Sequence, residues 1–280
     1  MTEQARPCWR LLDTGPADGC TNMAVDEALL EVYAAGSGPP TLRFYTWSPP
    51  AVSLGYGQTI EADIDLAKCR ALGIDVVRRP TGGRAVLHDD EVTYSVIVRE
   101  DDPRAAAGVL ASYLTVSQAL IRGLSYLGIS AELLPLQGVA SRSRQAVSPV
   151  CFATPSSYEV AVAGRKVIGS AQRRAHGIIM QHGSIPISLD LDKLGAVLGS
   201  SSSARRSLQQ AVDYHTRMTS LQEAGGRPYE YAEVITALSR GFADTWEVKL
   251  VPGELTAEEE QLSAYLRATK YSSDAWTWQR

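Results

Sequence analysis

Residues 150–172 read VCFATPSSYEVAVAGRKVIGSAQ, and this stretch predicts a β-hairpin preceded by a cysteine. Apolar and polar side chains alternate over residues 158–162, as they do in a half-buried strand. Ala163-Gly164 then supply a two-residue turn, and residues 165–168 begin the return strand. The hairpin is the local element from which the rest of the chain can be interpreted.

Two reactive side chains accompany this hairpin. Cys151 precedes it, and Lys166 lies just past its turn, where it is expected opposite Ala161. A nearby cation stabilises a thiolate over a thiol, so the pair could form a reactive cysteine. Contact would require residues 152–157 to fold back toward the hairpin. The spacing alone also allows a buried cysteine and a solvated lysine.

The elements around the hairpin predict an α+β fold. Strands dominate the first two thirds of the chain, and helices are interspersed among them without strict alternation, which favours a mixed, mostly antiparallel sheet over a doubly wound one. The expected strands are 9–13, 41–47, 51–55, 74–79, 85–88, 92–98, 158–162, 165–168, 176–183, 184–188 and 246–250, and the expected helices are 22–35, 61–72, 104–128, 190–198, 228–243 and 256–268.

A sharp break, PTGGR, occupies residues 80–84 between two of these strands. Adjacent glycines allow backbone angles closed to other residues and let a ligand approach the main chain. Three arginines, Arg78, Arg79 and Arg84, border the break, so backbone amides lie beside positive charge. That combination suits a carboxylate, a phosphate or a thioester oxygen. A plain tight turn between antiparallel strands is the alternative.

Composition excludes several classes of function. A net charge of −4 over 280 residues gives no support to nucleic-acid binding. The first ten residues lack the apolar core of a secretory signal, and no run reaches the ~18 apolar residues of a membrane span, so a cytoplasmic protein is expected. The four cysteines form no C-x-x-C pair and the four histidines form no ligand set, so neither a disulfide scaffold nor a metal site is predicted.

Several segments carry a family likeness. RRPTGGRAVLHD (residues 78–89) and GRKVIGSAQ (164–172) resemble the glycine-rich and lysine segments of the biotin/lipoate protein ligase and octanoyltransferase family. WRLLDTGPADGCTNMAVDEALL (9–30) and CFATPSSYEV (151–160) extend the likeness over roughly residues 9–275. The resemblance implies one catalytic domain over residues 1–280, with its core at 8–275 and the fold of class II biotin synthetases.

The same resemblance implies an activity and a set of site residues. The family's octanoyltransferases move an octanoyl group from octanoyl-acyl carrier protein to a lysine of a lipoyl-domain protein, such as the glycine cleavage H protein, without a cofactor. Cys151 matches the acyl-thioester nucleophile and Lys166 matches the lysine that lowers the pKa of that thiol. The substrate-binding candidates are Arg79, Gly82, Gly83 and His88. Acidic carrier domains would need a local positive surface, for which the candidates are Arg78, Arg142, Arg144, Arg165, Arg173 and Arg174.

Three alternatives remain open from the sequence. An ATP-dependent lipoate or octanoate ligase is one, although such ligases have a third glycine at Arg84 and no cysteine at Cys151. An amidotransferase that moves octanoyl groups between lipoyl domains is another, although such enzymes look less like this chain around His88-Asp89. A catalytically silent binder of acyl carrier protein or of lipoyl domains is the third.

Overall fold

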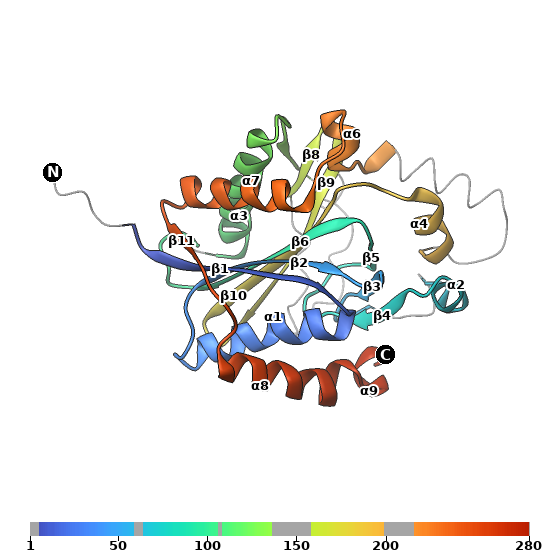
Figure 1. Cartoon of the computed structure of the whole chain (residues 1–280), viewed down its shortest axis with the longest axis horizontal. Helices are drawn as coiled ribbons and strands as arrows, with labels where there is room; N and C mark the ends of the chain where they lie inside the picture. Colours follow the sequence, from blue (N-terminus) through green and yellow to red (C-terminus); the bar gives the residue numbers. More distant parts are fainter. Residues whose placement is uncertain (1–5, 59–63, 106–107, 136–157, 199–215, 280) are drawn as a thin grey trace, which may run out of the picture.

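The computed structural model describes residues 6–58, 64–105, 108–135, 158–198 and 216–279. Within these ranges, eight strands form the main sheet (Figure 1). Its order is β11 (Lys249–Pro252), β1 (Cys8–Ala17), β2 (Thr41–Trp47), β6 (Glu91–Arg99), β10 (Ile178–Pro186), β9 (Arg165–Ala175), β8 (Tyr158–Val162) and β7 (Glu132–Pro135). β1 pairs in parallel with β11 and β2, and every later neighbour is antiparallel. The expected mixed, mostly antiparallel sheet is confirmed.

A second, three-stranded sheet presents the glycine-rich break. It has β3 (Ala51–Leu54) between β4 (Asp75–Arg78), which is parallel to it, and β5 (Val86–His88), which is antiparallel. The break therefore lies where the chain leaves β4 and returns along β5. Helices α2 (Leu66–Ala71) and α4 (Leu191–Val197) contact each other, and Cys69 and Val197 of these helices share one apolar cluster with Val52 of β3.

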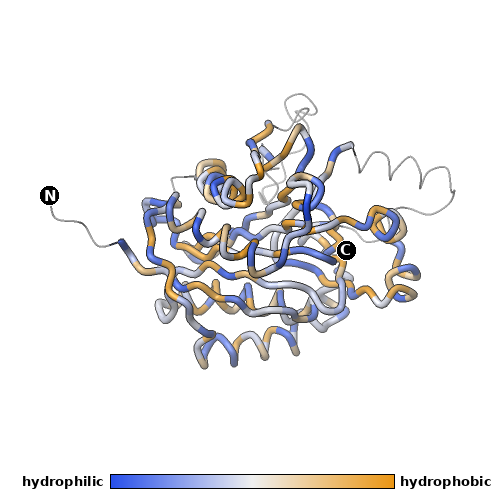
Figure 2. The backbone as a smooth tube through the Cα atoms, turned by 45° about the horizontal axis from the view of Figure 1, so that its top comes forward, coloured by the Kyte–Doolittle hydropathy of each residue, from blue (hydrophilic) through white to orange (hydrophobic). Residues whose placement is uncertain are grey.

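Helices cover both faces of the main sheet, because successive apolar side chains of a strand point to opposite faces. In β6, Val96 and Val98 belong to the core beneath α3 (Val109–Tyr126) and α7 (Tyr231–Thr245), whereas Ile97 between them belongs to the core beneath α1 (Gly19–Ala34). Helix α8 (Ala257–Leu266) packs on α1 from outside. Figure 1 shows these two helical layers on opposite sides of the strands, and Figure 2 shows hydrophobic and hydrophilic stretches alternating along the chain.

The C-terminal segment returns to the small sheet. Thr256 and Glu259 form a capping box at the start of α8, and Glu259 also forms an ion pair with Arg10 at 2.6 Å. After α8 the chain continues as one π-helical turn, η1 (Arg267–Tyr271), and a short helix, α9 (Asp274–Thr277), which contacts β4. No helix in the described ranges is long and apolar enough to cross a membrane.

The local expectations were correct at the hairpin and wrong at two strands. Ala163 and Gly164 both have positive φ, 49° and 78°, and Lys166 lies opposite Ala161 as expected. Residues 176–183 and 184–188 were expected to be separate strands, but β10 runs unbroken to Pro186 because β6 pairs with it along its whole length. The short elements β7, α6 (Leu221–Gly225) and α9 were not predicted, because elements of that length carry little periodicity.

The contact between α3 and α7 makes a strong prediction for Gly241. A β-carbon at Gly241 would lie 2.4 Å from the Gly123 nitrogen and 2.5 Å from the Ala119 carbonyl oxygen, and neither backbone atom can move aside easily. Gly241→Ala should therefore lower the free energy of unfolding by about 1–3 kcal/mol, measured by urea denaturation. Gly195→Ala in α4 is the matched control, because a β-carbon there would meet no atom within 4 Å, and it should gain about 0.5–1 kcal/mol. Equal effects of the two changes would contradict the tight helix contact.

Candidate active site

A β-bulge in the β8–β9 hairpin sets the direction of the Lys166 side chain. Val160 pairs with Ile168 and Ala161 with Lys166, so Val167 is an extra residue on β9. Bulges re-aim side chains and are frequent beside active sites. The Lys166 carbonyl oxygen also accepts a hydrogen bond from the Thr219 amide at 2.9 Å, which fixes the backbone at this position.

The ammonium of Lys166 forms an ion pair with Glu159. Their charged atoms lie 2.6 Å apart, and the side chains are 33% and 26% exposed, so solvent still reaches both. Gly169 makes room for the lysine, because a β-carbon there would lie 3.1 Å from Lys166 Cε. Glu159 was not predicted from the sequence. Its position two residues before Ala161, on the same face of β8, could have revealed it as a diagonal cross-strand partner.

Cys151, the predicted nucleophile, lies outside the described residues, as do Arg142 and Arg144. Tyr158, the first residue of β8, comes seven positions after Cys151. That length of chain can span at most about 25 Å, whereas the three positions from Tyr158 to Ala161 cover about 10 Å of strand. The chain is therefore long enough for Cys151 to return to Lys166.

Arg79 organises the glycine-rich loop from inside. Its guanidinium is buried and donates from Nη1 to the Ser53 carbonyl oxygen at 2.9 Å. Nη2 donates to the carbonyl oxygens of Gly82 at 2.7 Å and Arg84 at 2.8 Å. Burial, and then the charge of neighbouring Arg78, lowers the pKa of Arg79 to about 10, so it is still a cation at neutral pH. Arg79 thus turns two loop carbonyl groups inward.

The amide groups of the same loop are left available. The N–H groups of Gly82 and Gly83 donate to no acceptor among the residues that the structure describes, and Gly83 is exposed with φ +98°. The loop packs directly on residue 55, where only glycine fits, because a β-carbon there would lie only 2.0 Å from the Gly83 carbonyl oxygen. Arg84, at the end of the loop, is exposed. Carbonyl groups held by an internal donor, beside amides that remain free to donate, are what an anion or an oxyanion requires.

His88 lies in a buried polar cluster next to this loop. Its Nε2 is 2.7 Å from Ser53 Oγ, its Nδ1 is 2.8 Å from Glu91 Oε1, and its ring stacks on Trp47 with centroids 4.0 Å apart. Ser53 Oγ also accepts from Arg79 Nη1 at 3.1 Å. His88 and Arg79 are therefore joined through one serine hydroxyl.

A second buried histidine, His182, holds the loop from the other side, and it was not predicted from the sequence. Its Nε2 lies 2.7 Å from the hydroxyl of Thr81, and its Nδ1 lies 3.0 Å from Asp26. Burial would raise the pKa of Asp26, but the charge of Arg43 and the hydrogen bond from His182 outweigh it, so the pKa of Asp26 is lowered. Because an ionised Asp26 only accepts, Nδ1 of His182 carries a proton and donates it to the Asp26 carboxylate. No sequence spacing links these three residues.

One face of β10 connects these pieces. His182 and Ser184 are two residues apart on the strand, so they share a face; His182 contacts Thr81, and the hydroxyl of Ser184 donates to Glu91. Ser184 also lies opposite Gly169, the glycine against which Lys166 packs. Consecutive contacts therefore join Lys166 to the glycine-rich loop.

The expected positive surface does not form from the described arginines. The prediction was wrong for Arg78, which is fully buried. Arg165 forms an ion pair with Glu223, Arg173 with Glu27 at 2.8 Å, and Arg174 with Glu100 at 3.5 Å. These charges are largely compensated within the chain. The positions of the arginines in the sequence do not show which of them form ion pairs with carboxylates in the folded chain.

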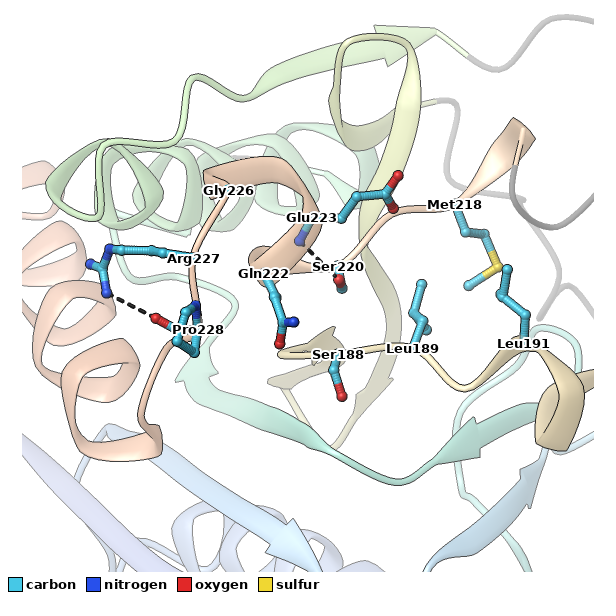
Figure 3. A pocket seen from close by; sticks show the side chains of 10 residues that line it. All are labelled: Ser188, Leu189, Leu191, Met218, Ser220, Gln222, Glu223, Gly226, Arg227 and Pro228. Carbon is cyan, nitrogen blue, oxygen red and sulfur yellow. Dashed lines mark hydrogen bonds between the residues drawn. The ribbon is translucent and has the colours of Figure 1, made fainter.

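A pocket of about 600 Å³ lies beside the Lys166 backbone (Figure 3). Met218, at one end of it, forms a backbone bridge with Lys166. Its lining residues come from the segment after β10 and from the segment around α6, namely Ser188, Leu189, Leu191, Met218, Ser220, Gln222, Glu223, Gly226, Arg227 and Pro228.

Comparison with known proteins identifies the family. The pattern of the lipoyl protein ligase A/B catalytic domain matches residues 18–243, well over half of the chain. The chain belongs to the lipoyl protein ligase A/B family. Octanoyltransferase LipM of Moorella thermoacetica is 47% identical over 268 residues, covering 96% of this chain and 97% of that protein. Octanoyltransferase LipM of Kyrpidia tusciae is 45% identical, covering 97% and 99%.

Solved structures of lipoyl protein ligase A/B relatives share the fold. The bipartite lipoate protein ligase of Thermoplasma acidophilum superimposes with a TM-score of 0.80 at 27% identity, covering 99% of this chain and 98% of that one. A lipoate-protein ligase A bound with ATP gives a TM-score of 0.78 at 27% identity, covering 98% of each. The expected lipoate ligase-like α+β fold is confirmed.

Proposed function

We propose that this chain transfers an octanoyl group from a thioester donor to a lysine of a lipoyl-domain protein through an acyl thioester on Cys151. The observation that carries the proposal is the glycine-rich loop, where Arg79 holds the carbonyls inward and the amides of Gly82 and Gly83 are left as donors. Similarity to LipM octanoyltransferases over nearly the full length supports the same chemistry.

The first half-reaction forms the acyl-enzyme. The Cys151 thiolate, stabilised by Lys166, attacks the carbonyl carbon of the donor thioester, and the carbonyl oxygen becomes an oxyanion. The amides of Gly82 and Gly83 stabilise that oxyanion. When the carbon–sulfur bond of the donor breaks, the donor sulfur leaves as a thiolate and takes up a proton from solvent. One thioester replaces another, so the exchange is nearly thermoneutral and needs no ATP.

The second half-reaction forms the amide. The neutral amine of the acceptor lysine attacks the acyl-Cys151 carbonyl carbon, a carbon–nitrogen bond forms, and the Cys151 thiolate leaves with its electron pair. The attacking nitrogen must lose a proton. We assign acceptance of that proton to the Glu159 carboxylate, 2.6 Å from Lys166 Nζ on the hairpin, because Lys166 is already protonated as the cation that stabilises the thiolate.

The partners follow from the chemistry of the two half-reactions. We propose octanoyl-acyl carrier protein as the donor and a lipoyl-domain protein, such as the glycine cleavage H protein, as the acceptor. The archaeal ligase with the same fold was solved in a study of a lipoylation system that includes an E2 lipoyl domain. Arg84, exposed at the end of the glycine-rich loop, is the candidate contact for an anionic group of the donor.

The experiment that tests this function is intact-protein mass spectrometry after mixing the protein with octanoyl-acyl carrier protein without ATP. We expect one added octanoyl group that hydroxylamine removes, because hydroxylamine cleaves thioesters. Similarity to an ATP-bound ligase makes ATP-dependent ligation the second candidate. Product formed only with ATP and free octanoate would establish that alternative, and partner binding without any acyl transfer would leave a silent binder.

The Glu159–Lys166 pair predicts opposite effects on the Cys151 thiol. Lys166→Met removes the cation that favours the thiolate, so the pKa of Cys151 should rise by at least about 1 unit. Glu159→Gln removes the carboxylate that offsets Lys166, so the same pKa should fall. The pH dependence of alkylation, followed by peptide mass spectrometry on the Cys151 peptide, measures both shifts. If both variants keep the wild-type profile, Lys166 does not act on Cys151.

A further inference from the structure

Arg78 is a fully buried arginine that donates to backbone carbonyl oxygens of two distant segments. Nη1 donates to Gly55 at 2.7 Å, to Tyr56 at 3.1 Å and to Gln58 at 2.8 Å. Nε donates to the carbonyl oxygens of Trp276 at 3.2 Å and Thr277 at 3.1 Å. One guanidinium therefore ties together two segments that lie about 220 residues apart in the sequence.

The first of these segments, residues 55–58, is in direct contact with the glycine-rich loop. The Tyr56 amide donates to the Thr81 carbonyl oxygen at 2.8 Å, and the Arg79 amide donates to Leu54 at 2.9 Å. Gly55 approaches Gly83 so closely that a β-carbon there would lie 2.0 Å from the Gly83 carbonyl oxygen. Any displacement of residues 55–58 would therefore displace the glycine-rich loop.

The second segment belongs to α9 and is anchored by its own contacts. Trp276 Nε1 donates to the Arg78 carbonyl oxygen at 2.9 Å, so the two residues bind each other in both directions. The Trp276 indole also packs against Tyr56, with ring centroids 5.8 Å apart, and under Lys270, whose Nζ lies 4.0 Å from the ring centroid. Lys270 in turn forms an ion pair with Glu27 of α1 at 2.6 Å.

We infer that α9 is a positioning element for the glycine-rich loop, and that Trp276 and Arg78 transmit its position through residues 55–58. This inference rests on the proposed function only for the identity of the group that the loop binds, namely the thioester carbonyl. α9 and Arg78 act through the loop without touching substrate, so they are positioning residues. The segment after α8 therefore influences the acyl-transfer site indirectly, through one buried cation.

The test compares Trp276→Ala with Trp278→Ala. Trp278 is the matched control because it lies at the end of the same helix and its indole donates only to Asp274, at 2.7 Å, among the described residues. Hydrogen exchange should accelerate at least about tenfold at the hydrogen-bonded amides of Tyr56, Gln58 and Arg79 in Trp276→Ala, with α3 unchanged as the internal reference. The KM for octanoyl-acyl carrier protein should rise about fivefold or more, with a smaller change in kcat. Trp278→Ala should match the wild type in both measurements.

A second variant keeps the test decisive if Trp276→Ala folds poorly. Arg78→Lys retains the charge but loses the planar fork that reaches both segments, so it should give the same local acceleration. Unchanged exchange at the Tyr56, Gln58 and Arg79 amides would overturn the inference, as would acceleration spread equally over α3 or local acceleration with an unchanged KM. A wild-type protein without octanoyl transfer would overturn the proposed function alone, because the exchange measurement still judges whether α9 positions the loop.

Discussion

Cys151→Ala is expected to lower octanoyl transfer at least about 1,000-fold, which corresponds to about 4 kcal/mol of transition-state stabilisation. Without the thiolate no acyl-enzyme forms, and the acceptor amine must attack the donor thioester directly. A steady-state assay with octanoyl-acyl carrier protein and a lipoyl-domain acceptor measures the loss. The acyl adduct should also be absent from the intact-protein mass spectrum.

Two further variants make that result specific. Cys151→Ser should also be inactive, because a hydroxyl is far too weak an acid for a neighbouring ammonium to ionise at neutral pH. Cys8→Ser is the control, since Cys8 is an exposed free thiol at the start of β1, and it should keep full activity. Turnover of Cys151→Ala at the wild-type rate would exclude the covalent mechanism and favour direct transfer in a ternary complex.

The second large effect is expected on stability, at Asp26. The fully buried Asp26 carboxylate accepts from Arg43 at 2.7 Å, Tyr45 at 3.0 Å and His182 at 3.0 Å. Asp26→Ala leaves the buried guanidinium of Arg43 without its counter-charge, which should cost about 3–5 kcal/mol of unfolding free energy. Asp101→Asn is the matched control, because the exposed Arg99–Asp101 pair should contribute at most about 1 kcal/mol. Urea denaturation at pH 7 compares them.

The pH dependence of stability gives the same site a second signature. The folded-state pKa of Asp26 lies below its unfolded value, so its stabilising contribution is complete above the unfolded pKa of about 3.9. The contribution is lost as the pH falls from there toward the folded pKa. Between pH 7 and pH 3.5 the wild type should therefore lose more stability than Asp26→Asn, which has no carboxyl to titrate. Parallel losses in the two proteins would show that Asp26 is not ionised in the folded state.

Local pattern predicted the elements that carry the chemistry. The alternation over 158–162 and the Ala163-Gly164 turn placed Lys166 opposite Ala161, and the two adjacent glycines of PTGGR marked the loop between β4 and β5. Both features are short-range: a turn needs particular backbone angles, and a strand repeats every two residues. The resemblance to known ligases and transferases supplied the overall fold, which the order of the expected strands and helices limited only to α+β with a mixed, mostly antiparallel sheet.

The interactions that the sequence did not predict are contacts between residues that lie far apart in the chain. His182 reaches Asp26 across 156 residues, and Arg78 reaches Trp276 across 198. The local sequence around each of these side chains carries no sign of its partner, and only the fold brings the partners together. The same reason explains why Arg78 was expected on the surface. A charged residue in a strand is most often solvated, and burial becomes tolerable only when backbone carbonyls from distant segments surround it.

The parallel pairing of β1 with β11 has a consequence for how the protein is made. Cys8 lies opposite Lys249, so one edge of β1 stays unpaired on the ribosome until about 240 further residues have been synthesised. At about 5–20 residues per second, that delay is on the order of 12–50 s. During this time β1 exposes a free row of backbone donors and acceptors, the kind of edge through which nascent chains associate with one another. The late arrival of β11 therefore leaves this edge of the emerging chain open until its synthesis is almost complete.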